Sequence, residues 1–202
     1  MIKSKFNSEP VSIKIGIVFA KLGISPNLWT IGAIIPAALG FLCLAFHNLV
    51  GGLIFFIISG FIDAVDGAVA RVTGNVTSYG AFLDGIIDRY VEVLLYIGLL
   101  FYLPETHGFL SNSIWISLLI FGALMPTYVR AYADHKGVVT EGEDQKRMGG
   151  ILERFERMTL IFIGMLAGCF NPTYLTYMII IVAILSNLTA LQRILFIVLK
   201  TK

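Results

Sequence analysis

Four aspartates occupy positions where an acidic side chain is costly. Residues 61–90 read FIDAVDGAVARVTGNVTSYGAFLDGIIDRY, and two otherwise apolar stretches there contain Asp63, Asp66, Asp84 and Asp88. The members of each pair are three or four residues apart, so each pair shares one face of a helix. Ionisable residues within apolar helices are functional candidates by default, because burying them is expensive. These carboxylates are therefore the candidate site of the chain.

The two pairs also match in depth. At 1.5 Å of helical rise per residue, the first pair lies roughly 7 and 12 Å before Arg71, and the second roughly 6 and 12 Å after Gly80. The short connection between the stretches predicts a helical hairpin in which all four carboxylates meet at one level. Four anions so close would repel one another. Mg²⁺ or Mn²⁺ would relieve this by binding the carboxylate oxygens, and two such ions would neutralise the cluster.

Small residues and one arginine accompany the aspartates. Gly67, Ala70 and Gly80 leave room beside the carboxylates, and Arg71 offers a forked donor suited to phosphate oxygens. Metal, guanidinium and open space together indicate phosphoryl chemistry. The alternative from a different class is a cation transporter that uses the aspartates as its ion site. That alternative leaves the glycines and the arginine at fixed offsets without a role.

The composition of the chain is that of a membrane protein. Of its 202 residues 57% are hydrophobic and 14% are charged, whereas soluble domains carry about 25% charged residues. Six apolar segments are each long enough to cross ~30 Å of hydrocarbon as a helix. They run over Leu28–Phe46, Leu49–Val72, Tyr79–Leu103, Ser113–Ala133, Ile151–Phe170 and Tyr174–Leu199. We predict an all-α integral membrane protein with six transmembrane helices, forming a single domain over residues 1–202.

The basic residues predict the orientation of these helices. Lysine and arginine are absent from three of the connections, at residues 47–51, 104–112 and 171–173. With six spans, all 15 basic residues fall on the opposite side, which the positive-inside rule makes cytoplasmic. We therefore expect a multi-pass protein of the cell membrane with both termini inside and its active site facing the cytoplasm.

A shorter apolar stretch precedes the first span. Residues Val11–Leu22 (VSIKIGIVFAKL) place Lys14 and Lys21 seven residues apart on an otherwise apolar helix that is too short to cross the bilayer. We predict an interfacial amphipathic helix in a leader over residues 1–24, ahead of a six-helix bundle over residues 25–202.

The residues singled out so far form one pattern. It reads Asp63-x2-Asp66-Gly67-x2-Ala70-Arg71-x8-Gly80-x3-Asp84-x3-Asp88. This resembles, at every position, the signature of the CDP-alcohol phosphotransferase family. The similarity extends to the topology, the leader and the residues Ser25-Pro26-Asn27 that open the first span. The resemblance implies a homodimeric, metal-dependent transferase of phospholipid synthesis that moves a phosphoalcohol group from a CDP-linked lipid to a polar alcohol and releases CMP.

The resemblance also implies roles for the site residues. Asp63, Asp66 and Asp84 are similar to the main metal ligands, and Asp88 to a general base that also faces the metal. The base would take the proton of the acceptor hydroxyl, which attacks the phosphorus that bears the lipid. The residues implied to bind the CDP group are Asn27, Thr30, Asp66, Gly67, Ala70, Arg71 and Gly80.

Three arginines are candidates for binding the acceptor. Arg130 lies near the end of the fourth predicted span, and Arg154 and Arg157 lie near the start of the fifth, all at the cytoplasmic side. Guanidinium groups there would suit an acceptor that already carries a phosphate. The alternative is that they contact lipid phosphates or follow the positive-inside rule.

The segments around these arginines, YVRAYAD and GILERFER, resemble those of family members that use inositol phosphate. These members are the archaetidylinositol phosphate synthases and the phosphatidylinositol phosphate synthases. Tyr132 departs from the pattern, since an arginine is common there. We expect CDP-archaeol or CDP-diacylglycerol as donor and inositol phosphate as acceptor, with glycerol phosphate as the main rival. The expected partners are these substrates and membrane lipids, with no nucleic acid.

Overall fold

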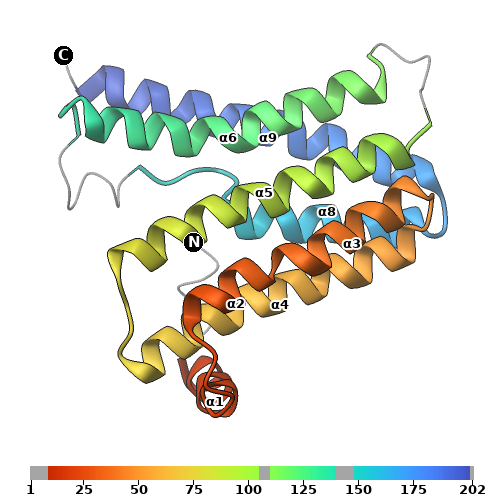
Figure 1. Ribbon diagram of the computed structural model, residues 1–202. Helices are drawn as coiled ribbons and strands as arrows, with labels where there is room; N and C mark the ends of the chain where they lie inside the picture. Colours follow the sequence, from red (N-terminus) through yellow and green to blue (C-terminus); the bar gives the residue numbers. More distant parts are fainter. Residues whose placement is uncertain (1–8, 105–109, 140–147, 201–202) are drawn as a thin grey trace. The chain divides into compact units, whose positions relative to one another are not determined.

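The computed structural model describes residues 9–104, 110–139 and 148–200, and all the regular structure in these ranges is helical. The prediction of an all-α fold is therefore confirmed. The helices are α1 (Glu9–Ala20), α2 (Pro26–Gly32), α3 (Ile34–Ala45), α4 (Leu49–Thr73), α5 (Ser78–Tyr102), α6 (Asn112–His135), α8 (Arg154–Gly168) and α9 (Pro172–Lys200) (Figure 1).

Four stretches are long and apolar enough to cross a membrane. They are Pro26–Ala45, Leu49–Thr73, Asn112–His135 and Pro172–Lys200, which makes the chain a multi-pass membrane protein. Helix α5 is as long as α4, but Asp84, Asp88, Arg89 and Glu92 make it less apolar. Helix α8 has 15 residues and rises about 22 Å, less than the ~30 Å of a hydrocarbon core. The count of six spans remains a prediction.

Two differences from the predicted helices are more than a shift of one or two residues at an end. The first predicted span is interrupted, because α2 ends at Gly32 and α3 begins at Ile34. Pro36 has no N–H to donate to the Gly32 carbonyl, and its ring crowds that carbonyl. The fifth predicted span begins at Arg154 and not at Ile151, because the residues just before α8 bond to side chains of α9.

The described residues group into two compact units. Among the described residues, the first comprises 9–43 and 51–95, and the second comprises 44–50, 96–104, 110–139 and 148–200. In the first unit α4 and α5 form a hairpin through residues 74–77, and Gly74 takes the left-handed conformation (φ +70°) that ends α4. Ser59 of α4 donates a hydrogen bond to the Ala33 carbonyl (2.8 Å) and so ties α4 to the break between α2 and α3.

Helix α1 packs closely on α4 within this unit. A Cβ atom on Gly16 would lie 2.5 Å from the Ala68 carbonyl oxygen and 2.6 Å from Val72 Cγ2, so only glycine permits this approach. The Phe19 ring also meets the Phe61 ring edge to face at 5.8 Å. The predicted leader thus contains a helix, and its amphipathic, interfacial character remains a prediction.

The second unit is built on the helix pair α6 and α9, which lie side by side (Figure 1). Their backbones approach at Gly122, where a Cβ atom would lie 2.7 Å from Asn187 Nδ2. Asn187 donates hydrogen bonds to the Leu118 carbonyl across the pair and to the Ala183 carbonyl of its own helix, both at 2.9 Å. Small residues and polar side chains therefore hold these helices together, as is usual in a membrane.

Candidate active site

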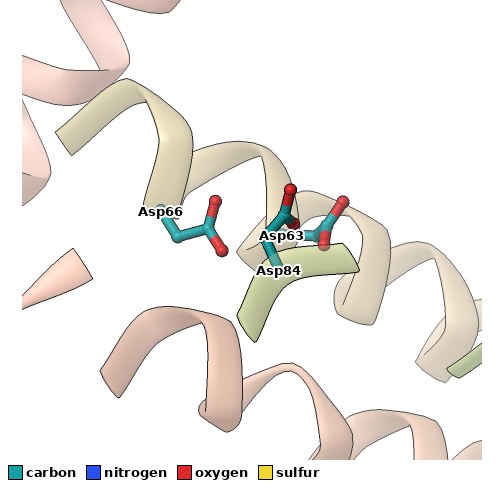
Figure 2. Close-up of side chains that lie close together, drawn as sticks. All are labelled: Asp63, Asp66 and Asp84. Atoms are coloured by element: carbon teal, nitrogen blue, oxygen red, sulfur yellow. The ribbon is translucent and has the colours of Figure 1, made fainter. Parts of the chain in front are cut away.

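Three of the four predicted carboxylates meet on the α4–α5 hairpin. Asp63 and Asp66 extend from α4 and Asp84 from α5, and one oxygen from each lies within 4.8 Å of the others. Figure 2 shows the three side chains lying close together. Asp66 is buried, and the other two are half-buried. The helical spacing and the short turn thus produce a compact acidic cluster.

The donor set of this cluster fits a divalent cation. Asp66 Oδ2 is buried and has no hydrogen-bond partner among the residues that the structure describes. The Thr30 hydroxyl and the Gly67 backbone lie beside the same carboxylate. Carboxylate oxygens are the ligands that Mg²⁺ and Mn²⁺ prefer, and a cation would offset both the mutual repulsion and the unsatisfied oxygen.

A cavity of about 300 Å³ opens beside the cluster. It is bounded by α2, the C-terminal half of α4, the connecting turn and the start of α5. All seven residues implied to bind the CDP group line it: Asn27, Thr30, Asp66, Gly67, Ala70, Arg71 and Gly80. The cavity also includes Asn75, Val76 and Thr77 of the turn, which the sequence analysis did not identify. Their position between the two aspartate stretches was the available signal.

At Gly80 the turn, α2 and α5 lie close together in the cavity wall. Thr77 Oγ1 accepts a hydrogen bond from the Gly80 N–H (3.0 Å) and so caps the first turn of α5. A Cβ atom on Gly80 would lie 3.1 Å from this hydroxyl and 3.3 Å from Asn27 Oδ1. The absence of a side chain at Gly80 therefore lets the first turns of α2 and α5 approach each other.

Arg71 is placed by two neighbours. A Cβ atom on Gly67 would lie 3.4 Å from Arg71 Nη1, so the guanidinium group lies close over the glycine. Arg71 Nη2 also donates a hydrogen bond to Ser12 Oγ of α1 at 2.6 Å. The leader helix thus holds the arginine at the cavity.

Asp88 lies one turn beyond Asp84 on α5, which is about 6 Å along the helix axis. It is half-buried and is not a member of the cluster of three carboxylates. The next two charged residues of α5 interact with each other: Arg89 and the buried Glu92 form a salt bridge of 3.1 Å. The role of Asp88 as base and additional ligand remains a prediction.

The three predicted acceptor arginines belong to the second unit. Arg130 lies near the end of α6 and Arg154 is the first residue of α8, and both are half-buried. Arg157, one turn further along α8, is buried with 3% of its surface exposed. Tyr132, which stands where an arginine was expected, stacks on Tyr128 with ring centroids 5.5 Å apart. The phosphate-binding role of these arginines remains a prediction.

A multi-pass helical protein with a carboxylate cluster beside a cavity fits the class of metal-dependent membrane enzymes. Comparison with known families identifies the family within this class. Residues 23–199 match the CDP-alcohol phosphatidyltransferase family, and the chain belongs to that family.

Individual relatives agree with this assignment. The archaetidylinositol phosphate synthase of Pyrococcus horikoshii is 34% identical over 181 residues, which cover 90% of this chain and 87% of that protein. The enzyme of the same name from Methanothermobacter thermautotrophicus is 34% identical over 151 residues, 74% of this chain and 71% of that protein. The fold matches the crystal structure of Mycobacterium tuberculosis phosphatidylinositol phosphate synthase with CDP-DAG bound, with a TM-score of 0.79 at 24% identity over 93% of this chain and 94% of that one.

Proposed function

We propose that this chain transfers the phospholipid moiety of a CDP-lipid to inositol phosphate and releases CMP. The observation that carries the proposal is that the carboxylate cluster borders a cavity lined by the complete set of residues implied to bind CDP. The names of the relatives support the products, since the two relatives described above are archaetidylinositol phosphate synthases. The related structure with bound CDP-DAG supports the donor.

The cluster and the cavity have separate tasks in this reaction. Asp63, Asp66 and Asp84 would hold the divalent cation, and two ions of Mg²⁺ or Mn²⁺ would balance the carboxylates including Asp88. A bound divalent cation supplies neutralising charge to a diphosphate and to the departing phosphate. Arg71 binds a diphosphate oxygen from the other side of the cavity.

The remaining groups act on the acceptor. Asp88 takes the proton of the acceptor hydroxyl, whose oxygen forms a bond to the phosphorus that carries the lipid. The bond from this phosphorus to the oxygen of CMP breaks, and CMP leaves with the bonding electrons. Arg130, Arg154 and Arg157 bind the phosphate that the acceptor already carries.

We place this reaction at the cytoplasmic face of the cell membrane. The six predicted spans put the site and both termini on the side that carries the basic residues, while the connections of the other side carry none. The lipid chains stay in the bilayer while the head group reacts. As in the family that it resembles, we expect the chain to act as a homodimer.

An acceptor panel tests the proposal. Purified protein in lipid nanodiscs receives CDP-archaeol or CDP-diacylglycerol, Mg²⁺ or Mn²⁺, and inositol phosphate, glycerol phosphate or free inositol. We expect release of CMP and a phosphorylated inositol lipid with inositol phosphate, loss of turnover in EDTA, and recovery on adding the metal. A preference for glycerol phosphate would make that compound the acceptor. Metal-dependent cation flux in proteoliposomes without CMP release would favour a transporter over an enzyme.

A further inference from the structure

The chain just before α8 is attached to α9 through its backbone. The Ile151 N–H donates to Gln192 Oε1 at 3.2 Å, and the Leu152 N–H donates to Thr189 Oγ1 at 3.0 Å. Thr189 and Gln192 are three residues apart on α9 and so share one face of that helix. Two successive amides are thus held by side chains from a helix almost forty residues away.

Thr189 is placed to serve as such an acceptor. Its side chain is fully buried, and its own hydroxyl proton goes to the Leu185 carbonyl at 2.9 Å. The oxygen lone pairs therefore remain for the Leu152 N–H. The Thr189 methyl group fills the space beside Gly150 so closely that a Cβ atom on this glycine would overlap Cγ2. The next nearest atoms, Thr189 Cβ and Arg193 Nη2, are 3.7 and 3.8 Å away, so the methyl group alone excludes a larger residue.

Helix α8 begins directly after this attachment. The Glu153 N–H, next in sequence, donates to Glu156 Oε2 at 2.8 Å and caps the helix. The amides of residues 151, 152 and 153 are therefore all held by side-chain oxygens, and the first turn of α8 has little freedom. Arg154 and Arg157 lie in that turn.

We propose that Thr189 and Gln192 are positioning residues that set the affinity for the phosphorylated acceptor by fixing the first turn of α8. This inference rests on the proposed function, because it acts through Arg154 and Arg157. Neither α9 side chain needs to touch a substrate. A bidentate guanidinium contact tolerates little displacement, so loosening the attachment weakens acceptor binding while the CDP-lipid site stays as it is.

A set of matched variants tests the attachment. Gly150→Ala should displace the segment and raise the acceptor KM by about tenfold, and Thr189→Val should do the same because it keeps the shape and loses the acceptor oxygen. Thr189→Ser keeps the oxygen and should behave as the wild type. The double variant Gly150→Ala with Thr189→Ser removes the overlapping methyl group and should regain an acceptor KM within about twofold of the wild type.

Two controls isolate the effect. Gly149→Ala adds the same methyl group at the adjacent residue, where a Cβ atom would meet no atom of the described residues within 4 Å, and should change nothing. The KM for the CDP-lipid should stay constant in every variant. Hydrogen exchange of the amides at residues 151–153 should be faster in Gly150→Ala and Thr189→Val and return to the wild-type rate in the double variant.

The outcomes separate this inference from the proposed function. If the wild type transfers to no phosphorylated acceptor, the proposed function fails, while the exchange rates still test the attachment. Unchanged exchange in Gly150→Ala and Thr189→Val, or a double variant as impaired as Gly150→Ala, overturns the attachment. Faster exchange with an unchanged acceptor KM overturns the positioning role.

Discussion

The carboxylates of the first unit and the arginines of the second are held in different ways. Asp63 and Asp66 project from one helix, and a short turn brings Asp84 beside them, so the cluster arises from local geometry. Arg154 instead opens a helix whose start is fixed by hydrogen bonds to α9.

This difference predicts how the enzyme would divide its tasks under the proposed roles. A metal site on one hairpin, with a CDP cavity beside it that α2 completes, would stay constant while the acceptor end changes through helix packing. We therefore expect substitutions in the first unit to affect the metal and the CDP-lipid, and substitutions in the second to affect the acceptor. The following experiments test that separation, beginning with the largest expected effect.

Asp66→Asn should lower kcat/KM by about 10⁴-fold, because the buried carboxylate would lose a charge that the metal requires. Mn²⁺ binding, followed by electron paramagnetic resonance, should weaken in parallel with CMP release. Asp134→Asn on α6, where the acid is exposed, is the matched control and should bind Mn²⁺ as the wild type does. Normal metal affinity in Asp66→Asn would remove the cluster from the metal site.

Asp88→Asn should lower kcat by about 10³-fold with the fold intact, because a general base contributes that order of rate. Since Asp88 lies outside the cluster of three, Mn²⁺ affinity should fall much less than in Asp66→Asn. The measurement compares the loss of Mn²⁺ affinity in Asp88→Asn with the loss in Asp66→Asn. A loss of metal affinity equal to that of Asp66→Asn would make Asp88 a ligand of equal weight, and retained turnover would remove it as the base.

The arginines offer a crossed test of the two units. Arg71→Ala should raise the KM for the CDP-lipid by about 30-fold, and Arg154→Ala should raise the KM for inositol phosphate by a similar factor. Each variant should keep the KM for the other substrate within about threefold of the wild-type value. Steady-state kinetics with each substrate varied in turn measures all four values. Equal effects of either variant on both substrates would contradict the division of tasks.

Gly80→Ala should raise the KM for the CDP-lipid by about fivefold, because its Cβ atom would press on Thr77 and Asn27 at the cavity wall. Gly85→Ala, on the same helix, is the control, since its Cβ atom would meet no described atom within 4 Å. That control should gain slightly in thermal stability, because alanine favours a helix over glycine. An equal KM in both variants would show that the close approach at Gly80 does not serve the nucleotide.

Much of the first unit could be predicted from the sequence. Apolar length predicts α4 as Leu49–Val72, one residue short of its observed end at Thr73. The spacing of the aspartates predicts that all four carboxylates meet at one level, because a regular helix and a short turn leave few other arrangements. The structure groups Asp63, Asp66 and Asp84, and Asp88 lies outside this group.

The sequence was less informative where tertiary contacts decide the structure. Helix α8 begins at Arg154 because the backbone N–H groups of Ile151 and Leu152 donate hydrogen bonds to side chains of α9. No local sequence pattern predicts partners so far along the chain. The interruption after Gly32 did have a local signal in Pro36, which apolar length alone does not capture. The contact between Arg71 and Ser12 joins residues 59 positions apart and depends on α1 packing against α4.

The shortness of α8 has a consequence for how water and lipid meet. Its 15 residues cover about 22 Å, which leaves about 8 Å of a typical bilayer core unmatched. A span this short is accommodated by thinning of the surrounding bilayer, by flanking side chains that reach the interface or by oligomerisation, and non-helical backbone within the hydrocarbon must find its hydrogen bonds within the protein. The side-chain acceptors of residues 151–153 meet that requirement. If α8 is the fifth predicted span, we expect the aqueous surface to dip toward the lipid beside it, so that a water-soluble acceptor reaches the head group and the CDP-lipid need not rise out of its leaflet.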